Sequence, residues 1–342
     1  MRVISSIRES WYDRSCDANV RKRHKTRKQT TYSIKMDSTT TNTKKAFPLN
    51  AVPTSTFFED CANYLMTALA SETDWKALLA LFAVADLTLI PLTLIRNAYC
   101  FSVGYGASVL TMASSMALAF DVPILDLWGT SHGPEVRLTQ VTILYGIRLT
   151  LYLLWREFCV LRMREQTEHF QSRPLRMVLP VAAFLGILYA SMVSPVFYAL
   201  RTPTTEATMK QVAWIGVAVA YLGLLLEAVA DYHKSQVKSA HKITYGEKRF
   251  VGPTGGTYAL SRHPNFLGEA LFWTGLWIGA VPSYGNNIMP WIVSTLGLIC
   301  IIMIMKQSAD RLDKKQVDWY GGQATFELWK ANVKGSIVPK LV

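Results

Sequence analysis

Long apolar runs alternate with polar stretches along most of this chain of 342 residues. A helix needs about 20 mostly apolar residues to cross the hydrocarbon layer of a bilayer, and several runs approach or exceed that length. They are Trp75–Ile95, Ala98–Phe120, Leu138–Trp155, Leu175–Leu200, Val212–Ala230, Phe266–Tyr284 and Ile288–Met305. A soluble domain of this size would not contain so many helices that are apolar on all sides. The pattern predicts an all-α fold, a polytopic membrane helical bundle with about seven transmembrane helices.

Basic segments outside the apolar runs indicate the orientation of this bundle. They are Arg156–Arg176, His233–Arg262 and the tail after Met305. Two apolar runs separate each consecutive pair, so all of these segments lie on one side, and an excess of Lys and Arg marks the cytosolic side. This topology leaves the basic N-terminal tail on the opposite side, whereas one further span within residues 46–74 would bring it to the cytosol.

The N-terminal part of the chain has a different composition. Residues 1–50 contain 12 Lys or Arg against 4 Asp or Glu, and so carry +8 of the formal net charge of +12. We expect residues 1–70 to be a disordered basic tail and linker, and residues 71–342 to be the membrane domain. The densest basic run is Arg21–Lys28. No aromatic residues and no predicted structured element accompany it, so nucleic acid is not an expected partner. Acidic residues in the tail argue against a transit peptide, and Met36 is an alternative start.

The sequence also argues against two common kinds of binding site. The cysteines are scattered without any C-x-x-C spacing, so we expect neither a metal site nor a disulfide framework. The loop Tyr245–Tyr258 contains glycines but matches neither the Rossmann nor the Walker signature. A dinucleotide, if one binds, is therefore held by membrane helices.

The junction Ser261–Glu269, which reads S-R-H-P-N-F-L-G-E, places polar groups where a loop enters an apolar helix. Proline suits the first helical position, and the free N–H groups that follow it attract anions. Asn265 and Glu269 then share one helix face, while Arg262 and His263 lie just outside, within reach of the same anion. A carboxylate about one turn inside the apolar layer is costly without a partner or a function. The simpler alternative is a helix cap with a snorkelling arginine and one buried ion pair.

A stripe of charge also follows one face of the fifth run. Glu227 and Asp231 are four residues apart, and Lys234 and Lys238 continue the face towards the basic side. Carboxylates can accept hydrogen bonds from ribose hydroxyls and cations can pair with phosphates, so the stripe is a candidate nucleotide site. Pairing between the charges at a helix end, with snorkelling lysines, is the alternative.

The third run contains Tyr145 and Arg148 one turn apart, and Arg156 marks its basic end. A buried tyrosine beside an arginine is a candidate proton donor to a carbonyl group, although such a tyrosine can also be a hydrogen-bonded core residue. Asp86 lies within the first run without a local partner. The sequence leaves open whether it contacts Arg148 or binds a polar group of the substrate.

These residues resemble a known family. The strings G-L-L-L-E-A-V-A-D-Y (Gly223–Tyr232), S-R-H-P-N-F-L-G-E and I-R-L-T-L-Y-L-L-W-R-E (Ile147–Glu157), with a tail ending in I-V-P (Ile337–Pro339), are similar to those of DUF1295 membrane proteins. That family is placed in the steroid 5-alpha-reductase superfamily. The resemblance covers roughly residues 75–342. It implies a seven-span bundle that holds NADPH near its cytosolic side, with the cofactor half in residues 212–342.

The resemblance also implies roles for the candidate residues. Asn265 and Glu269 match positions that contact the nicotinamide end of the cofactor, and Tyr145 matches the proposed proton donor, with Asp86 as its possible assistant. The other candidate cofactor contacts are Arg148, Arg156, Glu227, Asp231, Lys238, Arg262 and His263. Glu227 replaces an asparagine and Lys238 an arginine of the steroid reductases. The stretch Cys100–Gly106 keeps the family's glycines but lacks its acidic and Trp residues.

The resulting expectation is an NADPH-dependent reductase of a C=C bond in a sterol-like or other lipophilic enone. A lipophilic small molecule and membrane lipids are the expected partners. The endoplasmic reticulum is the first expectation for location, with a plastid or mitochondrial membrane as alternatives. A methyltransferase that uses S-adenosylmethionine on a lipid or prenyl substrate is one rival, since R-H-P-x-x-x-G strings also occur in such enzymes. A non-catalytic membrane protein that keeps the fold is the other.

Overall fold

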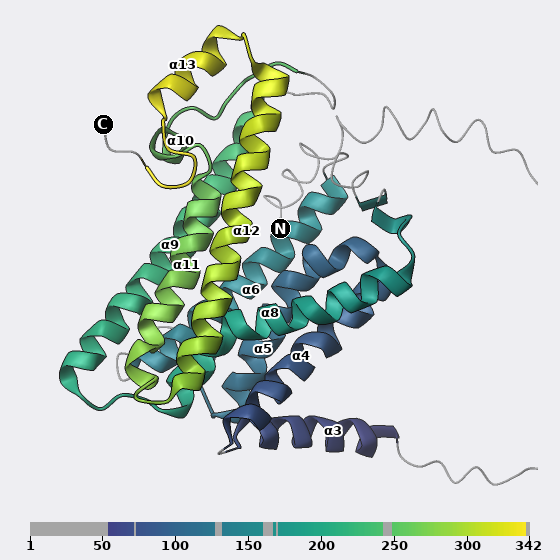
Figure 1. The fold of residues 1–342 in the computed structure, drawn as a ribbon, viewed down its shortest axis with the longest axis vertical. Helices are drawn as coiled ribbons and strands as arrows, with labels where there is room; N and C mark the ends of the chain where they lie inside the picture. Colours follow the sequence, from purple (N-terminus) through teal and green to yellow (C-terminus); the bar gives the residue numbers. More distant parts are fainter. Residues whose placement is uncertain are drawn as a thin grey trace, which may run out of the picture. The chain divides into compact units, whose positions relative to one another are not determined.

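The computed structural model describes residues 54–71, 73–126, 132–159, 167–168, 170–241 and 248–339. Within these residues the regular structure is helical, with no strand, and the long helices pack side by side into a bundle (Figure 1). The all-α prediction is confirmed. The basic run Arg21–Lys28 and Met36 lie outside the described residues.

The bundle is built from long helices that follow the apolar runs of the sequence. They are α4 (Asp74–Ile95), α5 (Val103–Ala119), α6 (Pro134–Cys159), α8 (Leu175–Arg201), α9 (Ala207–Ala240), α11 (Pro264–Ala280) and α12 (Ile288–Tyr320). In the described part, α4, α6, α8, α9 and α12 are long and apolar enough to cross a membrane. The chain is therefore a multi-pass membrane protein. Helices α5 and α11 have 17 residues each, so the count of seven spans stays a prediction.

Shorter elements precede, connect or follow the long helices. They are α3 (Thr54–Leu69), η1 (Asn97–Phe101), α10 (Thr257–Leu260), η2 (Val281–Ser283) and α13 (Ala324–Asn332). Helix α3 corrects the expectation that the linker extends to residue 70. It has 16 residues, which is too short to cross a membrane, and it is not among the candidate spans.

Small residues bring α9 and α11 into backbone contact. A Cβ atom on Gly268 would lie 2.5 Å from the backbone nitrogen of Glu227, and one on Gly216 would lie 2.1 Å from the backbone nitrogen of Gly279. Gly223 likewise lies against the backbone of Phe272. In a membrane, where apolar burial adds little between helices, such close packing of small residues holds helices together. It fixes the first turns of α11 beside the acidic stripe of α9.

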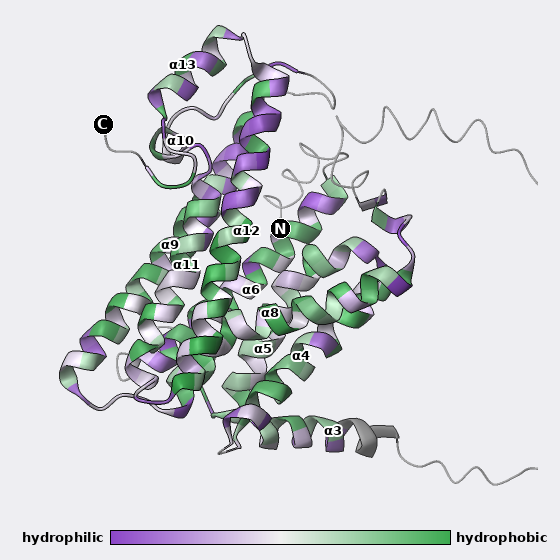
Figure 2. Cartoon of the chain, in the orientation of Figure 1, coloured by the Kyte–Doolittle hydropathy of each residue, from purple (hydrophilic) through white to green (hydrophobic). Residues whose placement is uncertain are grey.

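A polar layer covers one end of the bundle. Figure 2 shows that α12 changes from apolar to hydrophilic along its length and that α13 beyond it is largely hydrophilic. Phe326 and Trp329 of α13 form a small core with Tyr258 of α10 and Phe250. The Trp329 indole donates a hydrogen bond to the Tyr258 carbonyl at 3.0 Å. This layer holds the loop that leads into α11.

Candidate functional site

Arg148 of α6 joins the third and fifth apolar runs. Its guanidinium forms ion pairs with Glu227 and with Asp231, which lie one turn apart on α9. Both acids are buried, with residue exposures of 4% and 7%. A buried charge needs such a partner because its hydration is lost. Glu227 and Asp231 therefore pair with a cation on the neighbouring helix α6, and not only with charges on their own helix α9.

One carboxylate oxygen in this cluster is left over. Glu227 Oε2 is buried and has no hydrogen-bond partner among the described residues, whereas Oε1 accepts from Arg148. An unsatisfied buried acceptor is costly, so this oxygen is the atom most ready to accept a hydrogen bond from a ligand.

Arg156 continues the positive face of α6 towards the polar end. The Tyr152 ring lies between it and Arg148, with the guanidinium carbons 5.6 Å and 5.4 Å from the ring centroid. Such contacts with a π-face stabilise a cation. On α9, Lys238 is exposed at the same end of the bundle, and both it and Lys234 interact with other residues.

A second cluster, of hydroxyl groups and a carboxylate, lies deeper in the bundle. The Tyr105 hydroxyl donates to Glu269 Oε1 at 2.9 Å, accepts from Trp273 Nε1 at 3.0 Å and lies 3.2 Å from the Tyr145 hydroxyl. Tyr145 is fully buried, and its ring stacks on Phe272 with centroids 3.9 Å apart. This stacking fixes the tyrosine ring between α6 and α11.

The hydrogen-bond directions in this cluster follow from its chemistry. The indole N–H of Trp273 can only donate, and with Glu269 ionised the single O–H of Tyr105 is directed at the carboxylate. The Tyr145 hydroxyl then donates to the Tyr105 oxygen or to Glu269, with which it also interacts. In both arrangements its proton is held by an acceptor that a ligand oxygen can replace.

The two clusters form one polar site because α6 contributes to both. Tyr145 and Arg148 are one turn apart on α6, and Glu227 lies against Gly268, the residue before Glu269. The sequence identified most of these residues but not Tyr105 and Trp273. Tyr105 lies within the glycine-containing stretch Cys100–Gly106, where a hydroxyl group between two glycines was the available signal.

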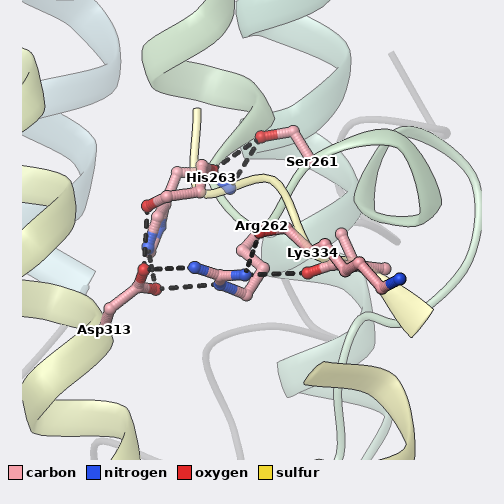
Figure 3. Close-up of polar contacts among 7 residues, drawn as sticks. Ser261, Arg262, His263, Asp313 and Lys334 are labelled. Atoms are coloured by element: carbon pink, nitrogen blue, oxygen red, sulfur yellow. Dashed lines mark hydrogen bonds and ion pairs between the residues drawn. The ribbon is translucent and has the colours of Figure 1, made fainter. Parts of the chain in front are cut away.

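Arg262 and His263, the expected anion site, form a clamp with Asp313 (Figure 3). The Arg262 guanidinium donates to Asp313 through Nε and Nη2, and to the carbonyls of Val333 and Lys334 through Nη1. His263 Nε2 lies 2.8 Å from Asp313 Oδ1. The groups of Arg262 and His263 named here therefore have partners within the protein, and their expected contact with a cofactor anion stays a prediction.

Asp313 is the centre of this clamp, and sequence reasoning did not identify it as a site residue. Its Oδ2 also accepts from the Ser336 hydroxyl at 2.8 Å, and the Ser336 carbonyl accepts from Ser261 and from the His263 amide. The clamp ties the start of α11 to α12 and to the segment after α13. The unusual charge density of residues 310–315 was the signal for it.

The remaining candidates lie apart from one another. Asn265, the second residue of α11, is half-buried, and its side chain makes no hydrogen bond within the described residues. Asp86 Oδ1 is buried and has no hydrogen-bond partner in the described part. It packs against Gly186 of α8, where an added Cβ atom would lie 2.0 Å from this oxygen. Asp86 therefore makes no ion pair with Arg148 and no hydrogen bond with Tyr145, which corrects two of its expected roles. A contact with a substrate group stays a prediction. No metal-binding group of His, Cys, Asp or Glu occurs in the described ranges.

The chain matches the model of a known protein family. The model of a family described as a protein of unknown function, DUF1295, matches residues 105–333. That range contains every residue of the two clusters and most of the clamp. No curated protein and no solved structure matches the chain.

Proposed function

The chain belongs to the DUF1295 family, and from this membership and the buried polar site we propose that it is a membrane-embedded, NADPH-dependent reductase. Its substrate would be a sterol-like or other lipophilic enone, whose C=C bond is reduced. The observation that carries the proposal is the Tyr145 hydroxyl, held by stacking and by the Tyr105–Glu269 pair inside a membrane bundle. The similarity of the sequence motifs to the steroid 5-alpha-reductases supports the same reaction class.

The described residues fit the nicotinamide and ribose end of NADPH. Glu227 Oε2 is an unused acceptor for a hydroxyl or carboxamide N–H, and the unpartnered Asn265 side chain lies at the start of α11. Arg156 and Lys238 supply positive charge towards the polar end, where phosphates would lie. Arg262 and His263 are not part of this fit, because they hold Asp313. When bound, NADPH supplies the hydride.

The side chains of the chain itself would bind, orient and polarise the substrate. A substrate carbonyl oxygen that replaces the Tyr105 oxygen as acceptor would receive the hydrogen bond from the Tyr145 hydroxyl. This polarises the enone and makes its β-carbon more electrophilic, and the same hydroxyl can then transfer its proton to the oxygen. The single O–H of Tyr105 can then turn to the resulting Tyr145 phenolate, while the Trp273 N–H donates to the Tyr105 oxygen. Stacking on Phe272 keeps the Tyr145 ring in one orientation throughout, so little orientational entropy is lost at the moment of reaction.

The test is turnover of the purified full-length chain with NADPH and a panel of lipophilic enones, including 4-ene-3-keto steroids. Tyr145→Phe keeps the ring and its stacking but removes the proton, so we expect the rate to fall by about 10²–10⁴-fold while NADPH binding is retained. Tyr64→Phe is the matched control, because Tyr64 is 75% exposed on α3. Undiminished turnover in Tyr145→Phe would contradict the assigned role.

The same protein also tests the rival function and the location. Methyl transfer from S-adenosylmethionine to a lipid or prenyl acceptor, without NADPH oxidation, would replace the reductase assignment by a methyltransferase. We place the protein in the membrane of the endoplasmic reticulum as part of the proposal, with plastid and mitochondrial membranes as the alternatives that imaging of the full chain would separate.

A further inference from the structure

A cavity of about 1000 Å³ lies at the end of the bundle opposite the Arg262–Asp313 clamp. The end of α8, the start of α4 and the connection between α11 and α12 form its walls, and Figure 1 shows these ends together, far from α13. The proposed reductase site uses none of these residues. The cavity therefore requires a separate explanation.

The charged residues of the cavity wall are two acids and one arginine, so the wall carries a small net negative charge. Asp74 at the start of α4 forms an ion pair with Arg201 at the end of α8, and Asn287 Nδ2 donates to Asp74 Oδ2 at 2.6 Å. Glu206 adds a further negative charge to the lining. A phosphate or other anion is therefore not favoured here, because the arginine is already engaged and the nearby acids repel anions.

The rest of the lining is rich in neutral hydrogen-bonding groups. Thr73, Thr204, Thr205 and Asn286 contribute hydroxyl and amide side chains, which both donate and accept. Most small-molecule sites are largely apolar with few polar groups. A wall with this many neutral donors and acceptors instead matches a ligand that carries several hydroxyl groups.

Tyr198 provides an independent indication of a ligand. It lines the cavity and is 2% exposed, yet its hydroxyl has no hydrogen-bond partner among the described residues. Its ring lies edge-to-face with that of Tyr284, with centroids 6.0 Å apart. Buried hydroxyls are normally satisfied. A ligand hydroxyl would give this group its partner.

We propose that this cavity binds a neutral sugar. The sugar is either the headgroup of a glycolipid, which the position at the ends of the apolar helices favours, or a free sugar that reaches the same groups from water. Asp74 and the Thr and Asn side chains hydrogen-bond its hydroxyls, and Tyr198 binds beneath it. The proposal does not depend on the reductase activity.

The experiment uses the full-length protein in nanodiscs made from phosphatidylcholine, with native mass spectrometry to count retained lipids. Monoglucosyl diacylglycerol, diacylglycerol and phosphatidylglycerol, all with the same acyl chains, are supplied as equal minor components. We expect preferential retention of the glucosyl lipid. Thr205→Trp, which fills the cavity from a loop, should abolish this preference. Gln211→Trp, at an exposed position outside the lining, should keep it.

Tyr198→Phe removes only the unpartnered hydroxyl, so the fold should be retained. We expect it to weaken glucosyl-lipid retention by about 2–10-fold, which corresponds to one neutral hydrogen bond. A free sugar is the ligand if the wild-type protein shows no preference for the glucosyl lipid but binds methyl glucoside to saturation. In that case Thr205→Trp should not bind methyl glucoside. Equal retention of the lipids with no methyl glucoside binding, or a preference that survives Thr205→Trp, would overturn the proposal.

Discussion

Arg148 contacts Glu227 and Asp231, and Tyr145 one turn earlier contacts Tyr105. The sequence identified Arg148, Glu227 and Asp231 separately, because each is an ionisable group within an apolar run or directly at its end. It could not pair them, because pairing depends on how α6 and α9 are rotated about their axes. It missed Tyr105 and Asp313 for the same reason: their roles arise only when distant helices are packed together.

At the scale of single residues, Arg148→Met should lower the free energy of unfolding by about 3 kcal/mol, because it leaves two buried carboxylates without a cation. Chemical unfolding of the detergent-solubilised protein measures this change. The triple variant Arg148→Met, Glu227→Gln, Asp231→Asn should recover part of the loss. No difference between the single and triple variants would show that the carboxylates are not the cause.

The helices match the apolar runs of the sequence within the membrane layer, which sets their length. At the polar end of the bundle, some helices extend beyond those runs. Helix α12 continues from the expected Ile288–Met305 to Tyr320, and α9 continues from Ala230 to Ala240. Hydropathy reports only the part of a helix that lies in the apolar layer, so these extensions were not predictable from it. The run Ala98–Phe120 is instead divided into η1 and α5.

The contact between α9 and α11 gives a prediction at this scale. Gly268→Ala should separate the two helices and lower the free energy of unfolding by about 1–3 kcal/mol, because its Cβ atom would lie 2.5 Å from the backbone nitrogen of Glu227. Gly255→Ala is the matched control, since nothing lies within 4 Å of a Cβ there. Equal unfolding midpoints for the two variants would show that close packing at Gly268 does not hold these helices.

For the whole molecule, the distribution of Lys and Arg predicts that the clamp end faces the cytosol and the sugar cavity faces the other side. Single cysteines at Asn332, the last residue of α13, and at Asn286, between α11 and α12, test this in a cysteine-free background. In sealed, oriented microsomes a membrane-impermeant maleimide should label Asn332→Cys from the cytosolic side. Asn286→Cys should react only after the membrane is permeabilised, and the reverse pattern would invert the orientation.

The central claim concerns the whole bundle, because residues from α6, α9 and α11 must together hold one cofactor. The most direct measurement is the stability of the purified full-length protein against unfolding with NADPH, NADH or S-adenosylmethionine. We predict stabilisation by NADPH, about 2.7 kcal/mol at a hundredfold excess over its dissociation constant, and a weaker effect in Glu227→Gln. Stabilisation by S-adenosylmethionine alone, or by none of the three ligands, would contradict the account.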